Sequence, residues 1–141
     1  GFRETRGLQC WLWSAVTPVT AFTSSAKAVT GVTAVQNFVL EPSWQNSTAS
    51  IQRAKDHHVT LGTDDAYAIV FPNTGDLPQL WVHPDQRRQG LGTQLLHDAY
   101  AIAQKPLRIM NIDDRHEGIA RFLERAGATK LVRQLELLRP L

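Results

Sequence analysis

The feature that most constrains the fold is a series of three strand-like segments joined by two amphipathic helices in the C-terminal half. The pattern predicts strands at residues 77–82, 107–112 and 131–141, and helices at 90–103 and 117–126. In both helices apolar side chains recur every three or four residues, which places them on one face. Strands joined by single helices form a sheet with helices packed against it. We therefore predict an α/β fold built on a mixed sheet.

The first half of the sequence adds strands and helices to this framework. The further predicted elements are strands at 8–17, 59–63 and 66–72, a helix at 24–39 and a helix that opens at Ser43. Asp64 and Asp65 separate two of these strands, and so short a polar connection predicts a hairpin. Gly127 follows the last helix, where a glycine is the usual C-terminal cap.

Length and composition fit a single domain over residues 1–141. The chain is 43% hydrophobic and 20% charged, as is usual for globular domains. The net charge of +2 is scattered, so we predict no nucleic-acid surface. No apolar run approaches the ~18 residues of a membrane span, so we predict no membrane insertion.

The cysteine and histidine residues give little sign of special chemistry. Cys10 is the only cysteine, which excludes an intrachain disulfide and is compatible with a cytoplasmic location, which we expect. The five histidines lack the spacing of metal ligands, so no metal site is predicted.

The segment RRQGLG, residues 87–92, lies between a predicted strand and a predicted helix. Gly90 and Gly92 lack a Cβ and allow backbone to approach a ligand closely. The first N–H groups of a helix have no intrahelical partner, and with the aligned peptide dipoles they attract anions such as phosphate. Arg87 and Arg88 add positive charge. The segment matches neither the P-loop nor the dinucleotide-binding pattern, so an ordinary turn with exposed arginines is the alternative.

The longer string VHPDQRRQGLGTQLL, residues 82–96, resembles the acetyl-CoA motif of the GCN5-related N-acetyltransferase (GNAT) family. In that motif a strand ends in Val-x-Pro, followed by Arg/Gln-x-x-Gly-x-Gly/Ala and an amphipathic helix. The matching residues here are Val82, Pro84, Arg87, Gly90 and Gly92.

The resemblance extends over most of the predicted element order. The string GIARFLERAGA, residues 118–128, resembles the family's last helix, with Glu124 and Gly127 at matching positions. Residues 1–40 show no such match, and residues 77–141 form the implied cofactor-binding half.

The resemblance implies a mixed, mostly antiparallel sheet with helices on both faces and a site for acetyl-CoA. The strand at 77–82 is expected to splay from its parallel neighbour at 107–112, with pantetheine in the gap and the pyrophosphate on the N–H groups of residues 88–93. The implied cofactor-binding residues are Leu80, Trp81, Val82, Arg87, Arg88, Gln89, Gly90, Leu91, Gly92 and Thr93.

The implied reaction is acetyl transfer from acetyl-CoA to an amine acceptor by direct attack. Family members commonly use a carboxylate on or beside the splayed strand as base and a tyrosine in the last helix as acid. Here Leu123 occupies the tyrosine position and residues 77–82 contain no carboxylate. Asp76, His116 and Tyr100 are substitutes, each with a purely structural alternative. No catalytic residue is assigned.

Two broader alternatives stay open. Leu123 is also compatible with a catalytically silent acetyl-CoA-binding module that regulates a protein partner. The unmatched N-terminal part is compatible with a homodimer or a tandem assembly. A small amine, an amino acid, an antibiotic and a protein terminus are all acceptors that the sequence leaves open.

Overall fold

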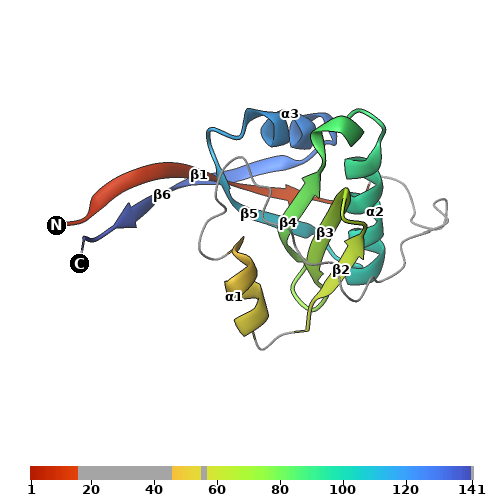
Figure 1. Ribbon diagram of the computed structural model, residues 1–141, viewed down its shortest axis with the longest axis horizontal. Coiled ribbons are helices and arrows are strands. Elements are labelled where there is room, and N and C mark those ends of the chain that lie inside the picture. The colour runs from red at the N-terminus through yellow and green to blue at the C-terminus, as the bar shows by residue number, and fades with distance from the viewer. Residues whose placement is uncertain (16–45, 55–56, 141) are drawn as a thin grey trace.

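A computed structural model describes residues 1–15, 46–54 and 57–140 (Figure 1). The elements in chain order are β1 (Arg3–Trp13), α1 (Thr48–Arg53), β2 (Val59–Gly62), β3 (Ala66–Phe71), β4 (Asp76–Val82), the 3₁₀ helix η3 (Pro84–Gln86), α2 (Leu91–Ala103), β5 (Leu107–Asp113), α3 (Glu117–Arg125) and β6 (Thr129–Leu138). None of the helices in these ranges is long and apolar enough to span a membrane.

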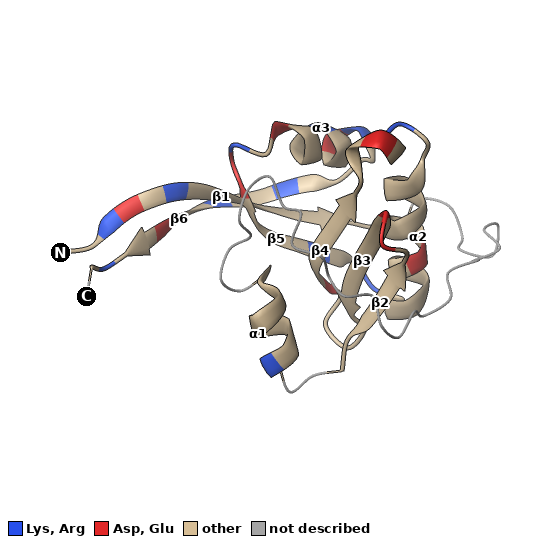
Figure 2. Cartoon of the chain, in the orientation of Figure 1, with Lys and Arg blue, Asp and Glu red and all other residues tan. Residues whose placement is uncertain are grey.

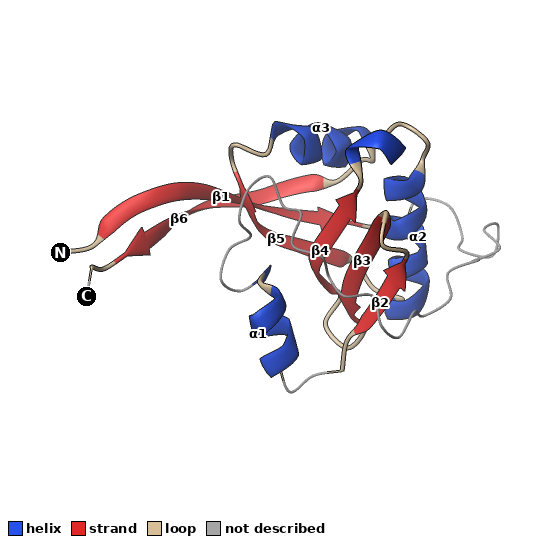
Figure 3. Ribbon diagram, viewed as in Figure 1, coloured by secondary structure: helices blue, strands red, loops and turns tan. Residues whose placement is uncertain are grey.

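The six described strands form one sheet in the order β2-β3-β4-β5-β1-β6 (Figure 3). The β4–β5 pair is parallel and the other neighbouring pairs are antiparallel. Helices cover both faces of the sheet. The packing of β3 shows this, since successive residues of a strand point to opposite sides. Ala68 and Val70 belong to the core cluster that contains α2 residues, whereas Ile69 packs with Ile51 of α1. The predicted mixed, mostly antiparallel sheet is confirmed.

The two parallel strands diverge after their first contact. Their recorded pairing is confined to Asp76 of β4 and Arg108 of β5, and the Arg108 amide donates to the Gly75 carbonyl at 2.8 Å. Beyond this point no β5 pairing holds the part of β4 that leads to Val82 among the described residues. The splay expected between residues 77–82 and 107–112 is therefore present.

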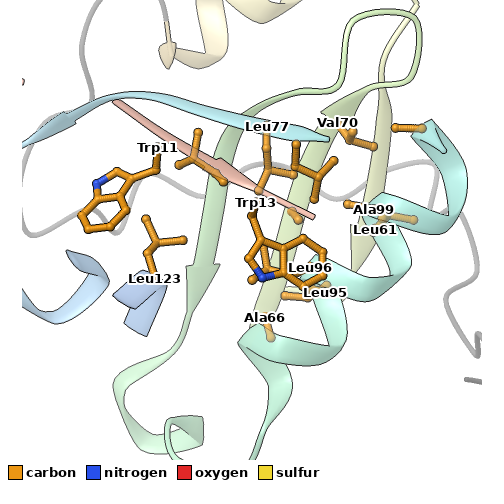
Figure 4. Packing of buried hydrophobic residues seen from close by; sticks show 14 residues of the cluster. Trp11, Trp13, Leu61, Ala66, Val70, Leu77, Leu95, Leu96, Ala99 and Leu123 are labelled. Atoms are coloured by element: carbon orange, nitrogen blue, oxygen red, sulfur yellow. The ribbon is translucent and has the colours of Figure 1, made fainter. Parts of the chain in front are cut away.

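The main core lies between the sheet, α2 and α3. From β1, Trp13 projects toward Leu96 of α2 and Trp11 toward Leu123 of α3, and both leucines are fully buried (Figure 4). The Trp13 indole Nε1 donates to the Ala126 carbonyl at 2.9 Å, which ties the end of α3 to β1. The last helix is thus fixed relative to the sheet by apolar packing and by one partly buried hydrogen bond.

Most predicted elements are confirmed, with differences at their ends. The first strand begins at Arg3 rather than at residue 8, because β6 pairs along it as far as Arg3 opposite Leu138. The last strand covers 129–138 rather than 131–141. The predicted hairpin at residues 59–72 is confirmed, and Gly127 has the left-handed φ of 87° expected of a helix-ending glycine.

The helix expected to open at Ser43 is shorter in the structure. It begins at Thr48, where the Ser47 hydroxyl caps it by accepting from the Ser50 amide at 3.2 Å. The helix predicted at 24–39 lies outside the described residues.

Candidate functional site

A cavity of about 1140 Å³ lies between the end of β4, the start of α2 and one side of α3. Drug-sized ligands usually occupy sites of roughly 300–1,000 Å³, so this one has room for a larger molecule. Nine of the ten residues predicted to bind a cofactor line it, namely Leu80, Trp81, Val82, Arg87, Arg88, Gly90, Leu91, Gly92 and Thr93. Gln89 does not line it.

The turn between β4 and α2 shapes one wall of the cavity. Arg88 and Gly90 both have left-handed φ angles, of 65° and 79°, which reverse the chain before the helix. Gly90 is the N-cap of α2 and provides no side-chain cap, so the first N–H groups of the helix stay available to a ligand. An arginine held at positive φ is uncommon and is a feature of functional turns.

Gly92 has a role that the sequence did not predict. A Cβ at this position would lie 3.1 Å from Cζ of Phe122 and 3.2 Å from its Cε2, so the bare Cα allows α3 to pack against the first turn of α2. The sequence interpretation attributed both glycines to ligand approach alone. The structure gives Gly92 a second role, because its missing side chain also makes room for the Phe122 ring.

The cavity is strongly positive. Arg87 and Arg88 line it from the turn and Arg121 and Arg125 from α3, while no carboxylate of the described residues does so. Figure 2 shows the basic segments of α3 and of the turn before α2 at the same end of the molecule. Four guanidinium groups around one cavity favour a ligand with several negative charges.

Arg121 and Arg125 were missed in the sequence. Their spacing of four residues places them on one face of α3, and the Arg125 guanidinium donates to the Arg121 carbonyl at 3.4 Å. Arg121 also forms an exposed ion pair with Glu117 at 3.4 Å. The four-residue spacing of these arginines can be read from the sequence. The packing of α3 is needed to show that the face carrying them borders the cavity.

His116 lines the same cavity at the start of α3. It is the N-cap residue, and its Nδ1 accepts a hydrogen bond from the Ile119 amide at 3.3 Å. Burial lowers the pKa of His116, and the charge of Arg87 lowers this pKa further. The neutral ring is therefore favoured, and because Nδ1 accepts, its proton lies on Nε2.

A polar network bridges β4 and β5 on the face of the sheet that carries α1. The Asn46 side chain donates to the Met110 carbonyl on β5 at 2.7 Å, and the Asn46 backbone carbonyl accepts from Gln79 Nε2 on β4 at 2.8 Å. The Tyr67 hydroxyl donates to Gln79 Oε1 at 3.2 Å, and burial raises the pKa of Tyr67 to about 12. The network therefore links the two splayed strands through Asn46.

Comparison with known protein families agrees with this architecture. The profile of the acetyltransferase (GNAT) domain matches residues 53–134, which run from the end of α1 into β6. The chain belongs to the GNAT acetyltransferase family. No curated protein and no solved structure matches it at a significant level. The GNAT match covers β4, α2, β5 and α3, the elements that surround the cavity.

This GNAT chain departs from the usual pattern at the tyrosine position. Leu123 is fully buried in the main core, on the side of α3 that packs against the sheet. Tyr100 packs edge-on against Trp13 with ring centroids 5.8 Å apart, and it does not line the cavity. Neither residue is placed to protonate a thiolate there.

The remaining substitute residues lie at different ends of the GNAT sheet. Asp76 is at the start of β4, where it lines a separate cavity of about 350 Å³ and lies 3.4 Å from the Arg108 guanidinium. His116 alone of the three substitutes weighed in the sequence lines the large cavity. Among the described residues no group of three potential metal ligands occurs.

Proposed function

We propose that this GNAT chain binds acetyl-CoA in the large cavity and transfers the acetyl group to an amine acceptor. The observation that carries the proposal is the set of four arginines around the open N-terminus of α2. Coenzyme A has a diphosphate and a further phosphate, so its charge complements this cavity. The cavity also extends to Leu80–Val82, where β4 has separated from β5.

Each wall of the cavity takes a separate part of the carrier in this proposal. The N–H groups of residues 91–93 and the side chains of Arg87 and Arg88 hold the diphosphate. The edge of β4 that faces the gap offers unpaired backbone groups to the amides of pantetheine, as a strand edge does to an extended peptide. Arg121 and Arg125 are available to the further phosphate.

His116 takes a binding role in the same proposal. It occupies the position before the last helix where GNAT proteins often have asparagine, and it caps α3 through Nδ1. The Nε2–H group remains free of that capping bond and serves as a donor to the bound carrier. A neutral imidazole suits this role, because it adds a hydrogen bond without requiring an acidic partner.

The acetyl transfer forms a C–N bond and breaks the thioester C–S bond. The neutral amine attacks the carbonyl carbon, the amine nitrogen loses one proton and the sulfur gains one. With Leu123 at the tyrosine position, we propose that water delivers the proton to sulfur and that catalysis rests on positioning the thioester and the amine.

A second function belongs to a different class. Because Leu123 is buried, a catalytically silent acetyl-CoA-binding module that acts on a protein partner is the alternative. Incubation with acetyl-CoA and a broad amine panel separates the two, with free thiol as the readout. Amine-dependent thiol release supports the enzyme, whereas carrier binding without release across the panel supports the silent module.

Calorimetric titration with acetyl-CoA tests the binding that both functions require. We expect Arg88→Glu to weaken binding at least tenfold, since a charge-assisted hydrogen bond contributes roughly 1.5–3 kcal/mol. The matched control is Arg53→Glu, which changes the charge equally at an exposed site on α1 away from the cavity. Wild-type protein that fails to bind acetyl-CoA would overturn the proposal, as would equal losses in the two variants.

A further inference from the structure

A second, smaller cavity of about 350 Å³ lies where β4 and β5 are paired and begin to diverge. Its lining includes Asp76 and Pro78 of β4 and Arg108 and Met110 of β5. Phe71 also lines it and packs against the buried cluster that includes α1, so the cavity lies on the α1 face of the sheet. Its volume is at the lower end of the range for small-molecule sites, which suits a small ligand.

The small cavity adjoins the large one along β4. Pro78 lines the small cavity, Leu80 lines the large one, and Gln79 lies between them. Gln79 donates to the Asn46 carbonyl, and the Asn46 side chain reaches across to the Met110 carbonyl of β5. A molecule in the small cavity therefore lies next to the part of β4 where the thioester end of a carrier in the large cavity would arrive.

Arg108 supplies this cavity with unused hydrogen-bond donors. Its Nε lies 3.4 Å from Asp76 Oδ1, and the Thr74 hydroxyl donates to Oδ2 of the same carboxylate at 2.9 Å. The two Nη groups of Arg108 donate no hydrogen bond within the part of the chain that the structure describes. The Arg108 side chain is 48% exposed. Asp76 thus holds the guanidinium in place and leaves its terminal N–H groups to a ligand.

The unused groups decide which ligand charge fits. A planar guanidinium binds a carboxylate through two parallel N–H···O bonds. Asn46, Asn111 and Gln134 add amide groups to the lining, and Asp76 is the single carboxylate among the described residues there. A cationic head group would have to displace Arg108 from Asp76, whereas a carboxylate leaves that ion pair intact.

We propose that the small cavity holds the acceptor and that Arg108 selects an amine that carries a carboxylate, so that the acceptor class is free amino acids. The inference rests on the proposed function and specifies its acceptor. The carboxylate binds the Nη groups of Arg108, and the neutral amine points along β4 toward Leu80.

The transfer then yields an N-acetyl amino acid and coenzyme A. The amine nitrogen forms a bond to the acetyl carbonyl carbon, and the C–S bond of the thioester breaks. One proton leaves the nitrogen and the sulfur gains one. Arg108 is a specificity-determining residue in this reaction, because it touches the acceptor and takes no part in the proton transfers.

Thiol release from acetyl-CoA with each of the twenty standard amino acids tests the inference. The best acceptor is then compared with its carboxamide and with the amine that lacks the carboxyl group. We expect kcat/KM to be about tenfold or more higher for the amino acid than for either analogue, since a hydrogen bond between charged groups is lost in both.

Substitutions of Arg108 assign the preference to this side chain. Arg108→Gln should remove the preference for the amino acid over its carboxamide, and Arg108→Lys, which keeps the charge without the planar fork, should retain part of it. Acetyl-CoA affinity in calorimetry should stay unchanged in both variants, which also shows that they fold. The matched control Arg53→Gln lies at the exposed end of α1, outside both cavities, and should retain the full preference.

The outcomes separate this inference from the proposed function. A chain that binds acetyl-CoA but releases no thiol with any amino acid would refute the inference and leave the carrier site standing. Equal kcat/KM values for the amino acid and its carboxamide would refute it as well, and so would a preference that survives in Arg108→Gln. A chain that fails to bind acetyl-CoA would overturn the proposed function and the inference together.

Discussion

Replacing Gly92 with alanine tests how α2 and α3 meet beside the cavity. The added Cβ would lie 3.1 and 3.2 Å from two ring carbons of Phe122. Carbon atoms in contact prefer a separation of about 3.5–4.0 Å, so the ring must move by roughly 0.4 Å or more. Phe122 also lines the cavity, which means that this movement changes the wall of the site.

Two opposing contributions set the change in the free energy of unfolding for Gly92→Ala. Overpacking typically destabilises a protein by about 1–3 kcal/mol. Alanine in place of glycine stabilises a helix by up to about 1 kcal/mol, and less in the first turn. We therefore expect Gly92→Ala to reduce stability by about 1 kcal/mol, with overpacking as the larger contribution.

The companion change Phe122→Leu removes the ring atoms that the new methyl group meets. In that background Gly92→Ala should stabilise the protein by a few tenths of a kcal/mol or more, since only the helix preference remains. The four proteins form a double-mutant cycle, measured by urea unfolding at 25 °C. We expect a coupling energy of about 1 kcal/mol or more, and additivity within about 0.5 kcal/mol would refute the reasoning.

Three further predictions follow from the charges and the cavity. Asp113 is 7% exposed, and its pKa is lowered to about 2 chiefly by the hydrogen bond from Arg115. Asp113→Asn should therefore cost roughly 2 kcal/mol in urea unfolding at pH 7, and this difference should shrink as the pH falls below about 5 and be lost once the pH passes below the folded pKa of about 2. A difference at pH 2 as large as that at pH 7 would contradict the assignment. The pKa of His116 is lowered by burial, so the folded state binds its proton less readily and stability should fall as the pH drops below about 6.5. His116→Asn should flatten the dependence of the free energy of unfolding on pH in this range. An unchanged slope would show that His116 does not cause this pH dependence. Gly92→Glu should abolish acetyl-CoA binding in calorimetry, because it adds bulk and negative charge beside the arginines, and unchanged affinity would show that the phosphates lie elsewhere.

The residues that sequence reasoning placed best belong to local patterns. The turn at 87–92 needs glycine at a left-handed N-cap, and Gly90 has that conformation. The helix at 117–126 has an apolar face, and Gly127 ends it as expected. These features depend on neighbours a few residues apart, so a single sequence contains what determines them.

The features that escaped prediction depend on contacts between distant segments. β1 extends to Arg3 because β6, more than a hundred residues later, pairs with it. Arg121 and Arg125 border the cavity because α3 packs on the sheet through Leu123 and beside Gly92 of α2 through Phe122. A helical pattern gives the spacing of side chains but not the direction in which the helix presents them.

The most direct test of the account is a crystal structure of the chain with bound coenzyme A. We expect the diphosphate within hydrogen-bond distance of the backbone N–H groups at the start of α2, with the guanidinium groups of Arg87 and Arg88 beside it. Pantetheine should run along the free edge of β4 toward the point where β5 diverges. A diphosphate bound away from the first turn of α2 would contradict the assignment of the cavity.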